Sequence, residues 1–305
     1  MSLGWGTMLA HSPENKPAEL LATSLAASAW CVIGGGNMAQ AIVLGAIEAG
    51  TIARDRFAIV EIEAEKRKVF LERGIAAHAA AREGLERLAS IESSPGDGHV
   101  LLAIKPQVLR GVAAELQPLL PGPAGGRRVV SILAGTPTAK LQEALGVSAR
   151  VIRAMPNTPA RIRRGTTALA CGRSCRKGDE NPTRALFESL GTVVHLDESL
   201  FDAFTAIAGS GPAYVFYLAE ALIEAAIEQG FPPSQADSVV RSMLAGSADL
   251  LSRENGQSAG ALRAAVTSKG GTTASATQVF DDARLMDIVS RAINSATERG
   301  RELSK

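Results

Sequence analysis

The stretch W-C-V-I-G-G-G-N-M-A, from Trp30 to Ala39, decides how this chain folds. Four apolar residues run into three glycines and then into a segment with helical periodicity, which predicts a strand, a tight loop and a helix. Gly34 permits the tight turn, Gly36 lets the backbone approach a phosphate, and Ala39 allows the helix to pack closely on the strand. In this setting the pattern G-x-G-x-x-A indicates a site for the pyrophosphate of a dinucleotide.

An acidic residue stands where a second strand should end. Phe57–Val60 is apolar, and Glu61 follows it about 25 residues beyond the glycines. A carboxylate at this place accepts hydrogen bonds from the ribose hydroxyls of NAD and repels the 2′-phosphate of NADP. The basic run Lys66–Lys68 would neutralise such a phosphate, although a solvated helix face is the simpler interpretation. The pattern points to NADH and leaves NADPH open.

Apolar runs alternate with amphipathic stretches through the first two thirds of the chain, as in a parallel sheet flanked by helices. Further strands are expected at Val100–Ile104, Arg128–Ile132, Val151–Met155 and Thr192–Leu196. Helices are expected at Met38–Ala49, Glu63–Arg73, Val108–Leu116, Thr138–Leu145 and from Asn181-Pro182 through Leu190.

Strand signals stop after Ser199, and helical periodicity continues to the end. Ala213–Gln229 and Pro233–Asn255 are apolar on nearly every face, so we expect a partner subunit to cover them. The alternative is that these helices pack on their own sheet domain. The sequence therefore predicts an α/β fold, with a Rossmann-like dinucleotide-binding domain followed by an all-α dimerisation domain. The expected boundaries are 1–29 for an N-terminal extension, 30–198 for the first domain and 199–305 for the second.

Composition restricts the class of partner. The 305 residues carry a net charge of +1, which gives no electrostatic footprint for nucleic acid or an anionic membrane. No run of about eighteen apolar residues occurs, so no membrane span is expected.

Three cysteines are too few for a disulfide framework and suit a reducing cytoplasm. Cys171 and Cys175 with His195 would lack a fourth ligand, so no metal site is expected. We interpret His195 as structural.

A second anion site is suggested by V-T-S-K-G-G-T-T, from Val266 to Thr273, which precedes a helical run at Ala274–Phe280. Hydroxyls and glycines before a helix leave backbone N–H groups outward, with the positive helix end behind them, so a carboxylate or phosphate would fit. An ordinary helix cap is the alternative.

Three more segments end predicted strands on the edge where open α/β sheets bind ligands. They are A-I-K-P-Q (Ala103–Gln107), S-I-L-A-G (Ser131–Gly135) and R-A-M-P-N-T-P (Arg153–Pro159).

Two longer motifs join these segments: D-A-F-T-A-I-A-G-S-G-P-A-Y (Asp202 to Tyr214) and L-R-A-A-V-T-S-K-G-G-T-T (Leu262 to Thr273). With all of these motifs, the chain resembles pyrroline-5-carboxylate reductase from Trp30 to Leu303. The resemblance implies the last step of proline biosynthesis, in which NADPH or NADH reduces a cyclic imine that bears one carboxylate. It also implies a homo-oligomer, either an interleaved dimer or a ring of such dimers. In the family, the carboxylate loop comes from the partner chain.

Matching positions carry the family's site residues onto this sequence. The resemblance implies cofactor contacts at Gly34, Gly36, Asn37, Met38, Ala103, Lys105, Pro106 and Asn157, to which the strand-end Glu61 is added. It implies substrate binding by Ser268, Gly270, Gly271, Thr272 and Thr273, closed by the corner Ser210-Gly211-Pro212. Ser268 and Thr273 are the candidate catalytic residues, and Thr273 would hydrogen-bond the ring nitrogen. A substrate bound as the iminium arrives protonated and needs no dedicated acid.

Three positions depart from the family pattern. Lys269 stands where proline is usual, Glu61 where a smaller polar residue is common, and Ala39 where glycine is usual. Lys269 would either strengthen carboxylate binding or face solvent. Alternative functions are a related β-hydroxyacid dehydrogenase, another cyclic imine reductase, or a dinucleotide-binding regulator without catalysis. The dehydrogenase would need a catalytic lysine in the helical domain, and the loop setting of Lys269 fits that poorly.

Overall fold

The computed structural model describes residues 27–120 and 126–304. Two compact units are present: one ends at Phe201 and takes in the last residues from Leu303, and the other is Asp202–Glu302. The expected N-terminal extension lies outside the described residues, except for residues 27–29.

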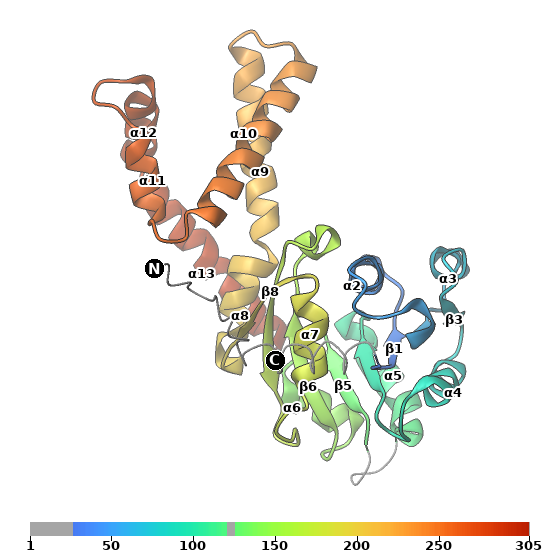
Figure 1. The fold of residues 1–305 in the computed structure, drawn as a ribbon. Helices are drawn as coiled ribbons and strands as arrows, with labels where there is room; N and C mark the ends of the chain where they lie inside the picture. Colours follow the sequence, from blue (N-terminus) through green and yellow to red (C-terminus); the bar gives the residue numbers. More distant parts are fainter. Residues whose placement is uncertain (1–26, 121–125, 305) are drawn as a thin grey trace, which may run out of the picture. The chain divides into compact units, whose positions relative to one another are not determined.

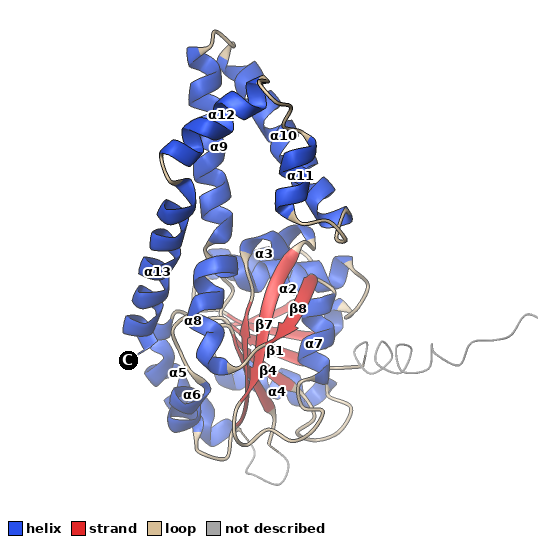
Figure 2. Cartoon of the chain, turned by 90° about the vertical axis from the view of Figure 1, so that its left-hand side faces the viewer, coloured by secondary structure: helices blue, strands red, loops and turns tan. Residues whose placement is uncertain are grey.

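The first unit is built on a sheet with the strand order β3-β2-β1-β4-β5-β6-β7-β8 (Figures 1 and 2). Neighbouring strands run parallel, except that β7 is antiparallel to β6. The order 3-2-1-4-5-6 is that of a doubly wound dinucleotide-binding fold, and β7 and β8 extend it. The strands are β1 (Trp30–Ile33), β2 (Phe57–Val60), β3 (Ala76–His78), β4 (His99–Leu102), β5 (Arg128–Ser131), β6 (Arg150–Met155), β7 (Gly165–Cys171) and β8 (Gly191–His195).

Helices cover both faces of this sheet (Figure 2). Side chains alternate along each strand, so Trp30 and Val32 enter one core while Cys31 and Ile33 enter the other. The first core packs against α2 (Asn37–Glu48), α3 (Ala64–Leu71) and α7 (Asn181–Glu188). The second packs against α4 (Ala81–Ile91), α5 (Leu109–Leu116) and α6 (Thr138–Leu145). Short 3-10 turns connect them: η2 (Arg54–Arg56), η3 (Pro106–Val108), η4 (Gln117–Leu119), η5 (Thr158–Ile162) and η6 (Glu198–Leu200).

The six predicted strands are all present, and β1 and β2 have the predicted bounds. Strand β3, strand β7 and helix α4 were not predicted. Strand β3 is a three-residue edge strand of two alanines and a histidine, and β7 is rich in Gly, Thr and Ala rather than branched apolar residues, so neither gives a strong strand signal. Helix α4 carries Leu85 and Leu88 one turn apart, a signal that was available in the sequence.

The second unit is helical, as predicted. Apart from Phe201 and the last residues of α13, it consists of α8 (Phe201–Phe204), a π-helical turn η7 (Thr205–Gly209), α9 (Gly211–Glu228), α10 (Pro233–Arg253), α11 (Ala259–Ala265), α12 (Thr272–Asp282) and α13 (Leu285–Ser304). Helices α9 and α10 pack against each other (Figures 1 and 2).

Large apolar side chains of the second unit are exposed. Phe216 is 62% and Tyr217 is 76% exposed, and α9 has no buried residue. By length and composition, Glu198–Glu228 would also suit a membrane-spanning helix. This stretch contains no uninterrupted apolar run of about eighteen residues, because charged residues such as Glu220 and Glu224 lie within it. Exposed large apolar side chains gathered on one helix indicate an interaction surface.

Candidate active site

The first glycine of the loop is fixed by three strands. Gly34 has a φ of +104°, and its N–H donates to the Val60 carbonyl of β2 at 2.7 Å. A Cβ at this position would lie 2.4 Å from the Ala103 carbonyl oxygen at the end of β4. Because both the dihedral angle and the space require it, only glycine fits here.

Gly36 differs from Gly34, because its backbone conformation is open to any residue and it faces open space. It caps α2 in an extended conformation, and a Cβ built on it would meet no protein atom within 4 Å. A ligand can therefore approach the backbone of Gly36 closely. Asn37 and Met38 begin the helix, whose first-turn N–H groups lack intrahelical acceptors, and no acidic residue lies in that turn. This end of α2 fits a dinucleotide phosphate.

The middle glycine contacts the acidic residue at the end of β2. Oε2 of Glu61 accepts the N–H of Gly35 at 2.7 Å, and Oε1 accepts the N–H of Glu63 at 2.9 Å. Glu61 is only 8% exposed. Arg67 donates from Nη1 to the Glu61 carbonyl at 2.7 Å, so it stabilises the end of the strand rather than standing free on a helix face. The role of Gly35 was not foreseen from the sequence.

Two further groups of predicted cofactor residues lie just after β4 and β6. Ala103 donates its N–H to the Ile33 carbonyl at 2.8 Å, and the exposed Lys105 caps η3, which begins at Pro106. Asn157 follows β6 and is 8% exposed, and its Oδ1 accepts the N–H of Thr166 at 2.9 Å. These residues follow the carboxyl ends of parallel strands, as the glycine loop does.

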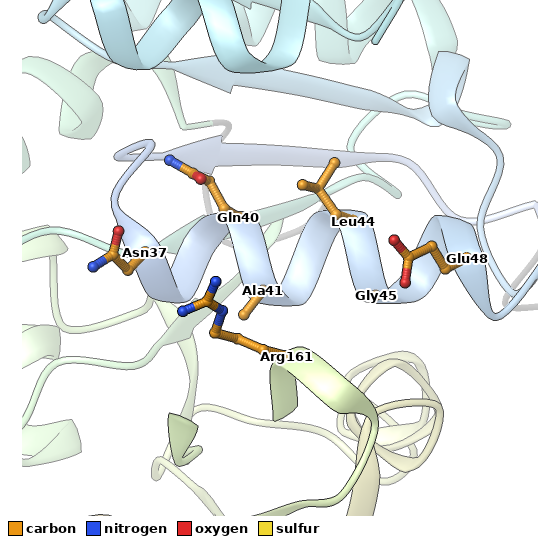
Figure 3. A pocket seen from close by; sticks show the side chains of 7 residues that line it. All are labelled: Asn37, Gln40, Ala41, Leu44, Gly45, Glu48 and Arg161. Carbon is orange, nitrogen blue, oxygen red and sulfur yellow. The ribbon is translucent and has the colours of Figure 1, made fainter. Parts of the chain in front are cut away.

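A cavity of about 210 Å³ runs along α2 from its first turn (Figure 3). The guanidinium of Arg161, from η5, points towards the first half of α2 (Figure 3). Arg161 was not identified from the sequence, although it follows the P-N-T-P motif closely. The lining residues are Asn37, Gln40, Ala41, Leu44, Gly45, Glu48 and Arg161.

The predicted substrate loop lies in the second unit. Gly270 has a φ of +71°, and the N–H of Gly271 donates to the Ser268 carbonyl at 3.0 Å. A Cβ on Gly271 would lie 2.4 Å from Oγ of Ser268. Helix α12 begins at Thr272, two residues before the predicted start, because Gly271 serves as its cap. Thr272 and Thr273 are therefore in the first turn, where N–H groups lack intrahelical acceptors.

The side chains of this loop differ in exposure. Ser268 and Lys269 are exposed, and Thr273 is half-buried. The corner Ser210-Gly211-Pro212 starts α9, directly after the π-helical turn η7. The hydroxyl of Tyr214 donates to the Ala206 carbonyl inside that turn at 3.0 Å. A π-turn breaks helical regularity and is frequent at functional sites, and apolar periodicity in the sequence does not reveal one.

Two expectations about titratable groups can be compared with the structure. His195 is exposed at the end of β8, so the apolar setting expected for it is wrong, and its structural role stays a prediction. No group of three or more His, Cys, Asp or Glu residues in the described part of the chain could hold a metal ion.

Comparison with known proteins gives consistent matches along the chain. Residues 198–303 match the family model "Pyrroline-5-carboxylate reductase dimerisation", and residues 30–135 match "NADP oxidoreductase coenzyme F420-dependent". The pyrroline-5-carboxylate reductase of Synechocystis sp. is 33% identical over 281 residues, which is 90% of this chain and 97% of that protein. That of Glycine max is 33% identical, covering 89% of this chain and 94% of the relative.

Solved structures agree with this result. The pyrroline-5-carboxylate reductase of Coxiella burnetii has a TM-score of 0.81 and 33% identity, covering 92% of this chain and 99% of that one. The Plasmodium falciparum pyrroline carboxylate reductase, solved with NADP bound, shares the fold at a TM-score of 0.78 and 23% identity. The match covers 91% of this chain and 98% of that one. With about a third of its residues identical to curated relatives over nine tenths of its length, the chain belongs to the pyrroline-5-carboxylate reductase family.

Proposed function

We propose that the protein reduces 1-pyrroline-5-carboxylate to L-proline by hydride transfer from NADH or NADPH, the last step of proline biosynthesis. The observation that carries this proposal is the pair of helix starts suited to anions. Helix α2 follows a glycine loop with room for a pyrophosphate, and α12 follows a hydroxyl-rich loop suited to one carboxylate. The alternative β-hydroxyacid dehydrogenase would need a catalytic lysine in the helical unit. Lys269 is the one lysine between Asp202 and Ser304, and it is exposed on a turn, so this alternative gains no support.

The substrate loop would act mainly by positioning. We assign the carboxylate to the loop residues and first-turn N–H groups, which neutralise an anion without a buried counter-charge. The hydroxyls of Ser268 and Thr273 are the proposed catalytic groups, with Thr273 holding the ring nitrogen. When bound, the reduced nicotinamide supplies the hydride. The substrate-binding residues proposed are Ser268, Gly270, Gly271, Thr272 and Thr273.

The cofactor residues belong to the sheet unit. The N–H groups that open α2 would bind the pyrophosphate, and residues after β4 and β6 would line the path to the nicotinamide. Glu61 would accept the ribose hydroxyls, which favours NADH. The proposed set is Gly34, Gly36, Asn37, Met38, Glu61, Ala103, Lys105, Pro106 and Asn157.

We also propose that the working form is an interleaved homodimer, alone or in a ring of dimers. Phe216 and Tyr217 on α9 are large and exposed, and a second subunit covers such a surface in an oligomer. This occupant, rather than a lipid bilayer, accounts for the apolar stretch Glu198–Glu228. Residues 30–198 would form the cofactor domain and residues 199–305 the dimerisation domain, and we place the protein in the cytoplasm.

The decisive experiment measures the loss of reduced-nicotinamide absorbance with 1-pyrroline-5-carboxylate and either NADH or NADPH. Saturable, imine-dependent oxidation with stoichiometric proline formation is expected. Assays that lack the imine give the background rate, and a six-membered cyclic imine tests the ring-size preference. Absence of imine-dependent turnover by folded, oligomeric protein would favour a cofactor-binding regulator instead.

A further inference from the structure

Two of the three cysteines lie together at the end of β7. Cys171 is the last residue of the strand and is exposed, and Cys175 is half-buried four residues later. The N–H of Cys175 donates to the Gly172 carbonyl at 3.1 Å, which closes a tight turn between them. The chain therefore folds back so that both residues reach the same place.

A single carbonyl group organises this turn. The Val151 oxygen of β6 accepts the N–H of Gly172 at 2.8 Å and the thiol of Cys175 at 3.0 Å. Because Gly172 follows Cys171 directly, that carbonyl holds both ends of the turn. The turn brings the Cys171 and Cys175 side chains close enough for each thiol to shift the pKa of the other.

We propose that Cys171 and Cys175 form a reversible intrachain disulfide, with a small-molecule disulfide such as oxidised glutathione as the oxidant. The exposed Cys171 gives solvent access to the pair. The disulfide would close a ring of only five residues, which constrains the unfolded chain little, so a bond that is easily reduced again is expected.

The two thiols have different chemical roles. The hydrogen bond from Cys171 lowers the pKa of Cys175, against the opposing effect of burial. The hydrogen bond to Cys175, burial and the nearby Glu180 carboxylate raise the pKa of Cys171. Cys175 is thus the first thiolate, and Cys171 the resolving thiol.

The reaction is a two-electron exchange. The Cys175 thiolate attacks one sulfur of oxidised glutathione, breaks its S–S bond and releases one glutathione thiolate. Cys171 then attacks the Cys175 sulfur of the mixed disulfide and releases the second. The two cysteine thiols are oxidised, glutathione disulfide is reduced to two glutathione molecules, and the two thiol protons pass to the leaving thiolates.

Cys31 supplies an internal control. It is buried in the sheet core, and burial raises its pKa to about 12, so it should not react in the folded protein. Of the three thiols in the chain, two should disappear on oxidation and one should remain.

The experiment treats the folded full-length protein with oxidised glutathione, quenches it with acid and counts thiols after unfolding. Peptide mapping should show a Cys171–Cys175 bond and a mass loss of about 2 Da. The Cys31→Ser variant should form the same bond, whereas Cys171→Ser should stop at a glutathione adduct on Cys175. A dithiol reductant should restore both thiols.

Strand β7 is antiparallel to β6, so Cys171 lies opposite Ile152, at the sheet edge away from the carboxyl ends of the parallel strands. Imine reduction should therefore be the same for oxidised and reduced protein, which separates this test from that of the proposed function. Retention of all three thiols, or a bond that includes Cys31 or a second chain, would overturn the proposal.

Discussion

The N–H of Gly35 donates a 2.7 Å hydrogen bond to Oε2 of Glu61, which joins the glycine loop to the end of the second strand. The second carboxylate oxygen is also bonded, to the N–H of Glu63. The carboxylate is therefore fixed in position before any nucleotide binds. A fixed anion at the ribose end of a dinucleotide site distinguishes NADH from NADPH by charge as well as by hydrogen bonding.

Replacing Glu61 with Ser should shift the cofactor preference. Removal of the carboxylate abolishes its repulsion of the 2′-phosphate, so the ratio of kcat/KM for NADPH to that for NADH should rise about 10-fold or more. Glu61→Gln separates the two effects, because the amide oxygen keeps one acceptor for Gly35 without the charge. Glu63→Gln is the matched control, since that carboxylate is exposed and paired with Lys66 at 2.6 Å. An unchanged ratio in Glu61→Ser would remove Glu61 from the ribose site.

The Thr273→Ala variant should lose imine turnover while retaining cofactor binding. A hydroxyl that holds a charged ring nitrogen contributes roughly 1.5–3 kcal/mol, so kcat/KM for the imine should fall at least about 10-fold. The KM for NADH or NADPH should change by less than about twofold, because cofactor residues belong to another part of the chain. Thr277→Ala is the control, since its hydroxyl donates back to the Thr273 carbonyl at 3.0 Å. Equal losses for imine and cofactor would contradict the assignment.

Arg161→Gln should weaken cofactor binding. A guanidinium beside the positive end of α2 is unfavourable unless an anion lies between them, and the phosphates of the cofactor would be that anion (Figure 3). We expect the KM for NADH to rise about 5- to 10-fold with little change in kcat, and the effect to diminish at high salt. Arg164→Gln provides the comparison, because Arg164 is exposed on the same segment and does not line the cavity. If both substitutions raise the KM for NADH equally, the effect comes from the loss of one positive charge, and Arg161 does not contact the cofactor.

The sheet and its order of elements were predictable because apolar runs and glycine loops carry a local signal. Strands β1 and β2 have the predicted bounds, since each is a fully buried run of four residues between clear turns. Strand β7 was missed because it gains its stability from pairing with both β6 and β8, a non-local property that G-T-T-A-L-A-C does not reveal.

The candidate site was foreseen in its motifs and not in its supporting contacts. The spacing of glycines predicted Gly34 and Gly36, but the bond from Gly35 to Glu61 joins residues 26 positions apart and depends on the sheet. The start of α12 at Thr272 was missed for a local reason instead, because the N–H of Gly271 closes a turn onto the Ser268 carbonyl and Gly271 caps the helix two residues before the predicted start. Contacts between distant segments are decided by tertiary packing, which motif spacing does not encode.

Two helical glycines should respond in opposite ways to alanine. A Cβ on Gly84 of α4 would lie 2.2 Å from Cγ2 of Val60 and 3.2 Å from Sγ of Cys31, so Gly84→Ala should cost about 1–3 kcal/mol of unfolding free energy. A Cβ on Gly111 of α5 meets nothing within 4 Å, so Gly111→Ala should gain about 0.5–1 kcal/mol. Urea denaturation of both variants measures this difference. Equal stability of the two would show that α4 does not pack on β2 as described.

A buried histidine should make the protein sensitive to mild acid. His99 is 1% exposed and stacks on Trp30 with ring centroids 4.4 Å apart, and its Nδ1 has no hydrogen-bond partner. Burial, followed by the charges of Arg128 and Arg150, lowers the pKa of His99 well below 6.5. The folded protein therefore keeps this ring neutral, whereas the unfolded chain takes up a proton below about pH 6.5.

The sign of the resulting pH dependence follows from proton uptake by the unfolded chain. Above about pH 6.5 His99 is neutral in both states, and its titration does not lower the unfolding free energy. Below about pH 6.5 the unfolded chain takes up the proton, and the unfolding free energy falls by about 1.4 kcal/mol for each pH unit. In His99→Phe the ring stack on Trp30 is kept and the titrating group is removed, so the variant should lose less unfolding free energy than the wild type between about pH 7.5 and pH 5.5. His195→Gln, at an exposed position on β8, should keep the wild-type slope. If His99→Phe and the wild type lose stability in parallel over this range, His99 is not the group that makes the fold sensitive to acid.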